Sequence, residues 1–271
     1  MTRDTENGRQ PPPELRPYLA DLADRVREVC GPRLVSVLVT GSVALGDYRH
    51  GRSDVDVTVV VEPDVPREAL RELARELAHP RLPCPAAGLE LVVYGADFAA
   101  RPSGAAGFLL NLNTGPLLPE RADHDAAGTP AFWFAIDRSI THRAAVTLWG
   151  RPAHRAIAEP GTADLFAALR ACMREHTDGE GHLADNRVLN GCRALVFCRT
   201  GRWTPKRAAG RQVAADDPAF RPLIESALHS FEQPRHAASA ALPATEVRAF
   251  LTRVRDEVDR AADAAGHPTA P

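Results

Sequence analysis

The sequence predicts an α+β protein in which a small mixed α/β sheet domain is followed by an all-helical bundle. In the first half, short β-branched runs alternate with amphipathic helical patterns, whereas beyond about residue 129 only helical patterns follow. The chain has 271 residues, of which 44% are hydrophobic and 25% charged. Such a composition is typical of a globular protein with room for two cores.

The first half contains two helical patterns and four strand patterns. Leu15, Leu19 and Leu22 recur at helical spacing and predict a helix over 14–29, and a second leucine pattern predicts a helix over 67–77. Short runs rich in β-branched and apolar residues predict strands, because such side chains pack well on a pleated surface. These strands are expected at 34–39, 54–61, 89–94 and 108–113.

The second half reads as a series of amphipathic helices separated by Pro and Gly clusters. The helices are expected at 132–148, 163–175, 186–199, 206–215, 218–231 and 245–262. The change of pattern predicts two domains, 14–130 and 131–262, flanked by disordered tails at 1–13 and 263–271.

Charge and cysteine usage exclude several classes of protein. With 33 basic and 35 acidic residues, the net charge of −2 does not suit a protein that coats nucleic acid or an anionic membrane. No apolar run is long enough for a transmembrane helix, and the polar, Pro-rich N-terminus is not a secretory signal. The five scattered cysteines show no metal-ligand spacing and indicate a reducing compartment. We therefore expect a cytoplasmic protein, and a monomer, that binds neither nucleic acid nor membrane.

Candidate chemistry concentrates between residues 34 and 61, where a strand leads into Gly41-Ser42 and the next strand opens with Asp54-Val55-Asp56. Residues two apart in a strand face the same side, so Asp54 and Asp56 project two carboxylates together. Such a pair favours a hard divalent cation with oxygen ligands, and Mg²⁺ is the cation we expect. Gly41 allows the backbone to approach a ligand closely, and Ser42 offers a hydroxyl and an N–H to a phosphate.

Glu90 opens a later strand and supplies a third carboxylate that could lie beside this pair. Each piece alone has a plainer interpretation, because Asp-x-Asp is common at solvated strand ends, Gly-Ser forms turns, and Glu90 could be an exposed strand residue. Their combination, in this order and on successive strands, favours a functional site.

These residues resemble the signature of the polymerase-β superfamily of nucleotidyltransferases: Gly41-Ser42, a spacer, Asp54-Val55-Asp56 and a later strand carboxylate. The surrounding sequence is similar to one branch, the aminoglycoside nucleotidyltransferases that adenylylate streptomycin and spectinomycin. In the second half, 186–193 and the segment 200–206, which reads TGRWTPK, resemble the helical domain of that branch. The resemblance covers about residues 14–260.

The resemblance implies roles for individual residues. Asp54 and Asp56 would bind Mg²⁺, which bridges the phosphates of ATP, and Glu90 would take the proton from the substrate hydroxyl. The 14–130 domain would be the nucleotidyltransferase domain, and the helical domain would bind substrate and close over the nucleotide. The residues that would contact the nucleotide are Gly41, Ser42, Ser53, Arg193 and Lys206. Lys206 is the only lysine of the chain.

The implied reaction is Mg²⁺-dependent transfer of AMP from ATP to a hydroxyl of a small molecule, with release of pyrophosphate. The acceptor would be an aminoglycoside or aminocyclitol, in a role such as antibiotic resistance. Two tryptophans of the streptomycin-modifying enzymes have no counterpart in 172–182 or 110–115, so a spectinomycin-like acceptor is favoured over streptomycin.

The residues expected to contact the acceptor, besides Glu90, are Asp178, Asp185 and Asn186. The stretch that carries them is acidic, which suits a polycationic acceptor, although a solvated loop between helices would look the same. The alternative function is nucleotidyl transfer to a non-antibiotic metabolite or to a protein partner, as in antitoxin-like AMP transfer.

Overall fold

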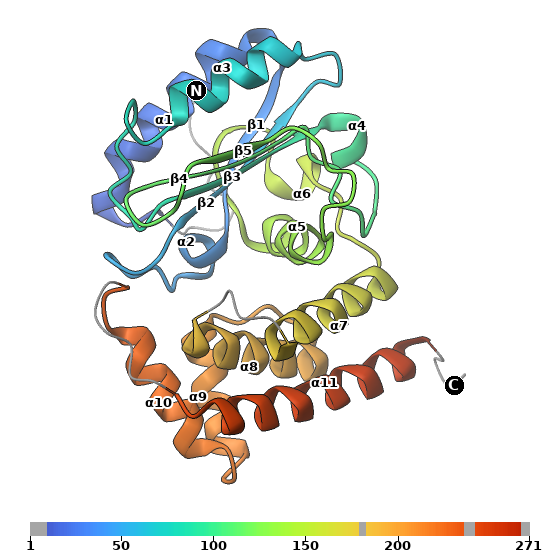
Figure 1. Cartoon of the computed structure of the whole chain (residues 1–271). Helices are drawn as coiled ribbons and strands as arrows, with labels where there is room; N and C mark the ends of the chain where they lie inside the picture. The colour runs from blue at the N-terminus through green and yellow to red at the C-terminus, as the bar shows by residue number, and fades with distance from the viewer. Residues whose placement is uncertain (1–9, 179–182, 236–241, 267–271) are drawn as a thin grey trace. The chain divides into compact units, whose positions relative to one another are not determined.

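The computed structural model describes residues 10–178, 183–235 and 242–266. The chain divides into two compact units, Met1–Pro160 and Gly161–Pro271, and the α+β class expected from the sequence is confirmed (Figure 1). The first unit contains, in chain order, α1 (Arg16–Cys30), β1 (Leu34–Val39), α2 (Gly41–Leu45), β2 (Val55–Val61), α3 (Arg67–Leu77), β3 (Leu89–Gly95), α4 (Ala96–Ala99), β4 (Leu110–Thr114), β5 (Arg121–Asp123), α5 (Phe132–Ala144), β6 (Val146–Gly150) and α6 (Ala153–Ala156).

The strands form one six-stranded sheet in the order β5-β4-β3-β2-β1-β6. Strands β2 and β3 are parallel, and every other neighbouring pair is antiparallel. The sheet is therefore mixed, as the sequence predicts. Its only parallel pair joins the two strands that carry the candidate carboxylates.

Helices cover both faces of the sheet (Figure 1). On one face, Val57 of β2 belongs to a large core that includes Leu22 of α1 and the leucines of α3. On the other face, Val60 and Tyr94 belong to a second core with Phe134 of α5. Because side chains alternate along a strand, Asp56, which precedes Val57, faces the same side as Val60.

The expected helix over 132–148 is wrong in its last turn. Helix α5 ends at Ala144, and the residues that follow form β6, which pairs antiparallel with β1. The run Val146-Thr147-Leu148-Trp149 is rich in β-branched and aromatic residues, which favour strands. It pairs with the edge of β1 that β2 does not occupy. Gly150 closes the pairing with a φ of +83°, and a Cβ there would lie 2.1 Å from the Val35 carbonyl oxygen. The edge strand β5 is also not predicted from the sequence, because its three residues, Arg-Ala-Asp, are too few and too polar to form a strand pattern.

The division between the units lies at Pro160, later in the chain than the expected division at 130–131. The reason is that α5 and β6 are part of the sheet unit. Arg138 of α5 is fully buried there, donates a hydrogen bond to the Ser103 carbonyl, and lies over the Phe98 ring at 4.7 Å. A guanidinium buried on an aromatic ring fixes α5 against this unit.

The second unit consists, within the described residues, of helices and connecting segments. The helices are α7 (Thr162–Asp178), α8 (Ala184–Thr200), α9 (Lys206–Asp216), α10 (Arg221–Glu232) and α11 (Ala244–Gly266). Helix α11 packs along α7 and α8 (Figure 1). No helix within the described ranges has the length and apolarity that crossing a bilayer requires.

The segments expected to be disordered tails, 1–13 and 263–271, overlap with helices of the described chain. The described chain begins at residue 10, and a 3₁₀ turn, Pro13–Leu15, leads into α1. At the other end α11 continues to Gly266, because Arg170 of α7 binds both Asp259 and Asp263, at 2.7 and 2.6 Å. Residues 1–9 and 267–271 lie outside the described part of the chain.

Candidate active site

The parallel pairing of β2 and β3 places Asp56 directly beside Glu90. Neighbouring strands are about 4.8 Å apart, and register partners present their side chains on the same face. Both residues are half-buried. Two carboxylates far apart in the sequence are thereby brought together.

Gly41 lies against the Asp56 carboxylate. The Thr40 amide donates to the Asp56 carbonyl at 2.9 Å, and the chain then turns through Gly41 with a φ of +58°. A Cβ on Gly41 would lie 1.8 Å from Asp56 Oδ2, so a side chain at this position would displace the carboxylate. The atoms that lie close to Gly41 in the structure are those of the Asp56 side chain, and the approach to a ligand stays a prediction.

The two serines of the motif have different surroundings. Ser42 Oγ is buried and has no hydrogen-bond partner among the described residues, as expected of a hydroxyl that serves a ligand. Ser53 Oγ accepts a hydrogen bond from the Arg49 amide at 3.0 Å and closes the turn before β2. Helix α2 has only five residues, so its dipole is small, and a phosphate would depend on Ser42 rather than on the helix.

Asp54 directly precedes β2, and Tyr48 lies earlier in the same loop. Burial raises the pKa of the Tyr48 hydroxyl to about 12, and the charges of acidic groups, Glu14 first and Asp54 last among them, add to that rise. Tyr48 therefore remains a neutral phenol at physiological pH.

The donor set fits a cation that shares its ligands with a substrate. Within the described residues, no group of three or more His, Cys, Asp or Glu side chains is arranged to hold a metal ion. Mg²⁺ in phosphate-transferring sites is commonly held by one or two carboxylates together with substrate phosphates and water. Asp54 and Asp56 could supply such a pair, which leaves Glu90 for another role.

A polar row continues from the carboxylates along the sheet. Glu90 is the register partner of Asn113 on β4, and Asn113 is the partner of Arg121 on β5. Asn113 is half-buried and shares the face of Glu90 and Asp56. Asn113 is not singled out from the sequence: the alternation of Leu110, Asn111, Leu112 and Asn113 indicates that it shares a face with Asn111, but only the register with β3 places it beside Glu90.

The second unit carries its own polar cluster around α8. Lys206, the first residue of α9, donates to Asn186 Oδ1 at 3.1 Å, and Arg193 donates to Asn190 Oδ1 at 3.2 Å. Asn190 Nδ2 lies 3.0 Å from Nε2 of the buried His176. The expected cations Lys206 and Arg193 are thus both held by asparagines of one helix.

In the acidic stretch expected to form a loop, the described residues on both sides of 179–182 are helical: α7 runs to Asp178 and α8 begins at Ala184. Asp178 ends α7 and is exposed, whereas His176, two residues earlier, is buried within that helix. Asp185 is only 2% exposed, and its carboxylate accepts hydrogen bonds from the Asn186 amide and from the Ser230 hydroxyl of α10. These contacts give Asp185 a structural role in bracing α8. Glu180 and His182 lie outside the described residues.

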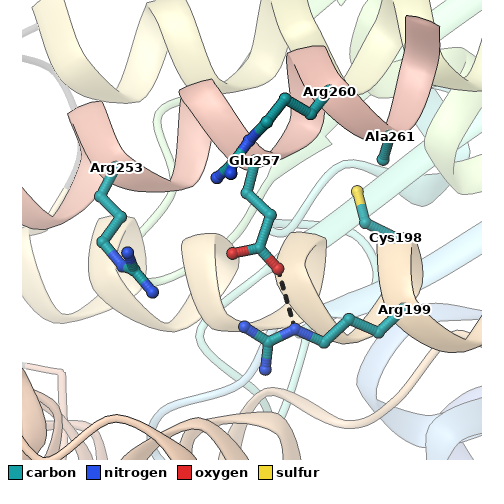
Figure 2. A pocket seen from close by; sticks show the side chains of 6 residues that line it. All are labelled: Cys198, Arg199, Arg253, Glu257, Arg260 and Ala261. Atoms are coloured by element: carbon teal, nitrogen blue, oxygen red, sulfur yellow. Dashed lines mark hydrogen bonds and ion pairs between the residues drawn. The ribbon is translucent and has the colours of Figure 1, made fainter. Parts of the chain in front are cut away.

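A pocket of about 460 Å³ opens between α8 and α11 in the same unit (Figure 2). Two of its three arginines pair with carboxylates. Arg199 binds Glu257 at 2.9 Å, and Arg253 binds Asp217 at 3.3 Å, whereas Arg260 donates to the Asp256 carbonyl at 3.1 Å. The pocket contains none of the residues singled out from the sequence, and the ion pair of Arg199 with Glu257 connects helices α8 and α11.

Comparison with known proteins assigns both units. Residues 20–83 match the nucleotidyltransferase domain model, and residues 160–257 match the model of the aminoglycoside adenylyltransferase C-terminal domain. The first match includes Gly41, Ser42 and Asp56, and the second includes Arg193 and Lys206. No curated protein sequence is significantly similar to the chain.

A solved structure with a similar fold is spectinomycin adenyltransferase AAD(9) from Enterococcus faecialis with ATP and spectinomycin. The TM-score is 0.67 at 15% sequence identity, over 90% of this chain and 98% of that chain. This likeness concerns the fold, whereas the two family matches concern the sequence. The chain is therefore a nucleotidyltransferase of the aminoglycoside adenylyltransferase type, built from a nucleotidyltransferase domain and the C-terminal domain of that family.

Proposed function

We propose that this enzyme transfers AMP from ATP to a hydroxyl of an aminocyclitol or aminoglycoside and releases pyrophosphate, with a spectinomycin-like acceptor preferred over streptomycin. The observation that carries the proposal is the register of β2 and β3, which sets Glu90 beside Asp56, with Gly41 seated on the Asp56 carboxylate. In this proposal Asp54 and Asp56 form the cation-binding pair, and Glu90 acts as the base.

In the proposed reaction, the acceptor hydroxyl oxygen attacks the α-phosphorus of ATP in line. A new oxygen–phosphorus bond forms, the bond to pyrophosphate breaks, and the hydroxyl proton passes to the Glu90 carboxylate. A base beside the reacting oxygen needs to be ionised and within hydrogen-bond reach of it. Asp54 and Asp56 would hold Mg²⁺, which when bound neutralises charge on the phosphates.

The chain would bind the triphosphate through neutral and cationic groups. Ser42 offers a buried hydroxyl with no partner among the described residues, and Ser53 lies at the same turn as Asp54. We assign Arg193 and Lys206 to the phosphates, because the C-terminal family match covers both and cations suit that ligand.

The acceptor preference is supported by the side chains near Glu90. Strand β4 presents Asn111 and Asn113, where the streptomycin-modifying enzymes are expected to carry a tryptophan. Amides can donate and accept hydrogen bonds with a hydroxyl-rich ring, but they offer no stacking platform for a large sugar. We retain Asn186 and the exposed Asp178 as candidate acceptor contacts on the helical unit, whereas the buried Asp185 supports them structurally.

The proposed function is tested by pyrophosphate release from Mg·ATP with spectinomycin, streptomycin and other aminoglycosides, with Asp54→Asn as the inactive control. We expect release that depends on spectinomycin and is lost in Asp54→Asn. Release with streptomycin at an equal rate would contradict the acceptor preference. Mg·ATP binding without release on any of these acceptors would favour a metabolite or protein acceptor, and absence of ATP binding would overturn the proposal.

We further propose that the enzyme acts as a monomer in the cytoplasm, where ATP is available. The five cysteines are all free thiols, and four of them are buried, which suits a reducing compartment. A role in resistance would follow if the acceptor is an antibiotic, and expression in a susceptible bacterial host would measure it directly.

Replacing Gly41 with alanine is expected to weaken Mg·ATP binding by about 10-fold or more, because the new Cβ displaces the Asp56 carboxylate. The positive φ adds about 1–3 kcal/mol of strain to the folded state. Calorimetric titration and thermal unfolding measure the two effects separately.

Gly128→Ala is the matched control for this variant. Gly128 also has a positive φ, of +73°, but a Cβ there would meet no atom within 4 Å. We expect this variant to lose stability while keeping its ATP affinity. Equal affinity in both variants would show that the contact between Gly41 and Asp56 does not matter for nucleotide binding.

A further inference from the structure

The second unit holds a chain of hydrogen bonds that leads from His176 through Asn190 to Arg193, one of the proposed phosphate contacts. Asn186, Asn190 and Arg193 lie at positions i, i+4 and i+7 of α8 and therefore share one face of that helix. His176 of α7 meets this face at Asn190. His176 is 1% exposed and Asn190 7% exposed, so their polar atoms are withdrawn from water.

The direction of each hydrogen bond follows from the chemistry of the groups. A guanidinium can only donate, so Asn190 must turn its oxygen toward Arg193, at 3.2 Å. The Asn190 amide nitrogen then faces His176 Nε2 at 3.0 Å. An amide nitrogen can only donate a hydrogen bond. His176 Nε2 is consequently the acceptor and carries no proton. The imidazole thus fixes the orientation of the Asn190 amide.

We propose that His176 and Asn190 are positioning residues that hold Arg193 in place for the phosphates of the nucleotide, an inference that rests on the proposed function. The Asn190 oxygen that accepts from Arg193 belongs to a neutral amide, so this contact orients the guanidinium and adds no negative charge of its own. Asn186 holds Lys206 through the same kind of contact.

The inference predicts that Asn190 acts on the nucleotide only through Arg193. Asn190→Leu is expected to raise the dissociation constant for Mg·ATP by about 10-fold, as loss of a hydrogen bond to a charged group does. In an Arg193→Ala background, the same substitution should change that constant by less than about 2-fold. A role in packing alone would instead give the same loss in both backgrounds.

His176 supplies a second test that does not depend on the Asn190 variant. Glutamine can place an amide oxygen near the position of Nε2, so His176→Gln is expected to keep the affinity within about 3-fold of the wild type. His176→Leu removes the acceptor and is expected to match Asn190→Leu. Thr177→Val is the control. It removes a buried hydroxyl next to His176 on α7, and this hydroxyl donates to the Met173 carbonyl at 2.7 Å and not to Asn190 or Arg193.

The experiment is a set of calorimetric titrations of the full chain with Mg·ATP, accompanied by thermal unfolding of each variant. Coupling of Asn190 to Arg193, rescue by glutamine and an unchanged affinity in Thr177→Val would support the inference. Additive losses, or equal affinities in His176→Gln and His176→Leu, would overturn it while leaving nucleotide binding intact. A wild-type chain that does not bind Mg·ATP would overturn the proposed function and this inference together.

Discussion

Replacing Asp56 with asparagine is expected to lower the rate of pyrophosphate release by about 10³-fold or more. Asp56 is one of two carboxylates that would hold the cation, and loss of that cation removes several kcal/mol of charge stabilisation in phosphoryl transfer. Its side chain also lies against Gly41 and beside Glu90, so its charge acts at the centre of the site. Asparagine keeps the shape of the side chain, and the fold should survive.

Asp24→Asn is the control for this substitution. Asp24 is an exposed residue of α1 that pairs with Arg27 at 2.8 Å, and surface pairs of this kind contribute little to stability. We expect the control to keep full activity and both variants to unfold at temperatures close to that of the wild type. Asp56→Asn activity within about 10-fold of the wild type would remove Asp56 from cation binding.

Replacing Glu90 with glutamine is expected to lower turnover by about 10²-fold or more, the usual contribution of a positioned general base. Mg·ATP affinity should change by less than about 2-fold, because Glu90 is proposed to act on the acceptor hydroxyl.

Glu68→Gln serves as the matched control, since Glu68 is an exposed glutamate of α3 that pairs with Arg71 and Arg75. Its turnover should equal that of the wild type. Undiminished turnover in Glu90→Gln would exclude Glu90 as the base. A large loss of ATP affinity would instead place Glu90 among the nucleotide or cation ligands.

The elements with strong periodicity could be predicted from the sequence. Residue periodicity alone predicts the strands at 34–39 and 54–61 and the helix over 67–77. The bounds of these elements in the structure agree with the predicted bounds to within one residue. The end of α5 was not predictable in this way, because the residues after Ala144 continue an apolar pattern that suits either state. Pairing with the free edge of β1 decides that they form a strand.

The residues of the candidate site also fall into those that the local sequence predicts and those that depend on contacts between distant segments. The sequence pointed to Asp54, Asp56 and Glu90 through residue type and spacing, and those properties are local. It did not reveal Asn113, because its place beside Glu90 depends on the register between β3 and β4. The sequence also predicts that His176 lies in a loop after a helix over 163–175. In the structure α7 continues through His176, and the side chain of His176 is buried in the second unit.

The sequence by itself determined the fold class, the order of sheet and helical regions, and the residue types of a nucleotidyltransferase site. Periodicity and motif spacing follow from neighbours along the chain, and a single sequence records them directly. Only the tertiary structure decided that Glu90 stands beside Asp56, that Gly41 closes on that carboxylate, and that Asn190 joins His176 to Arg193. These relations depend on strand register and helix packing, which are set by contacts between segments far apart in the sequence.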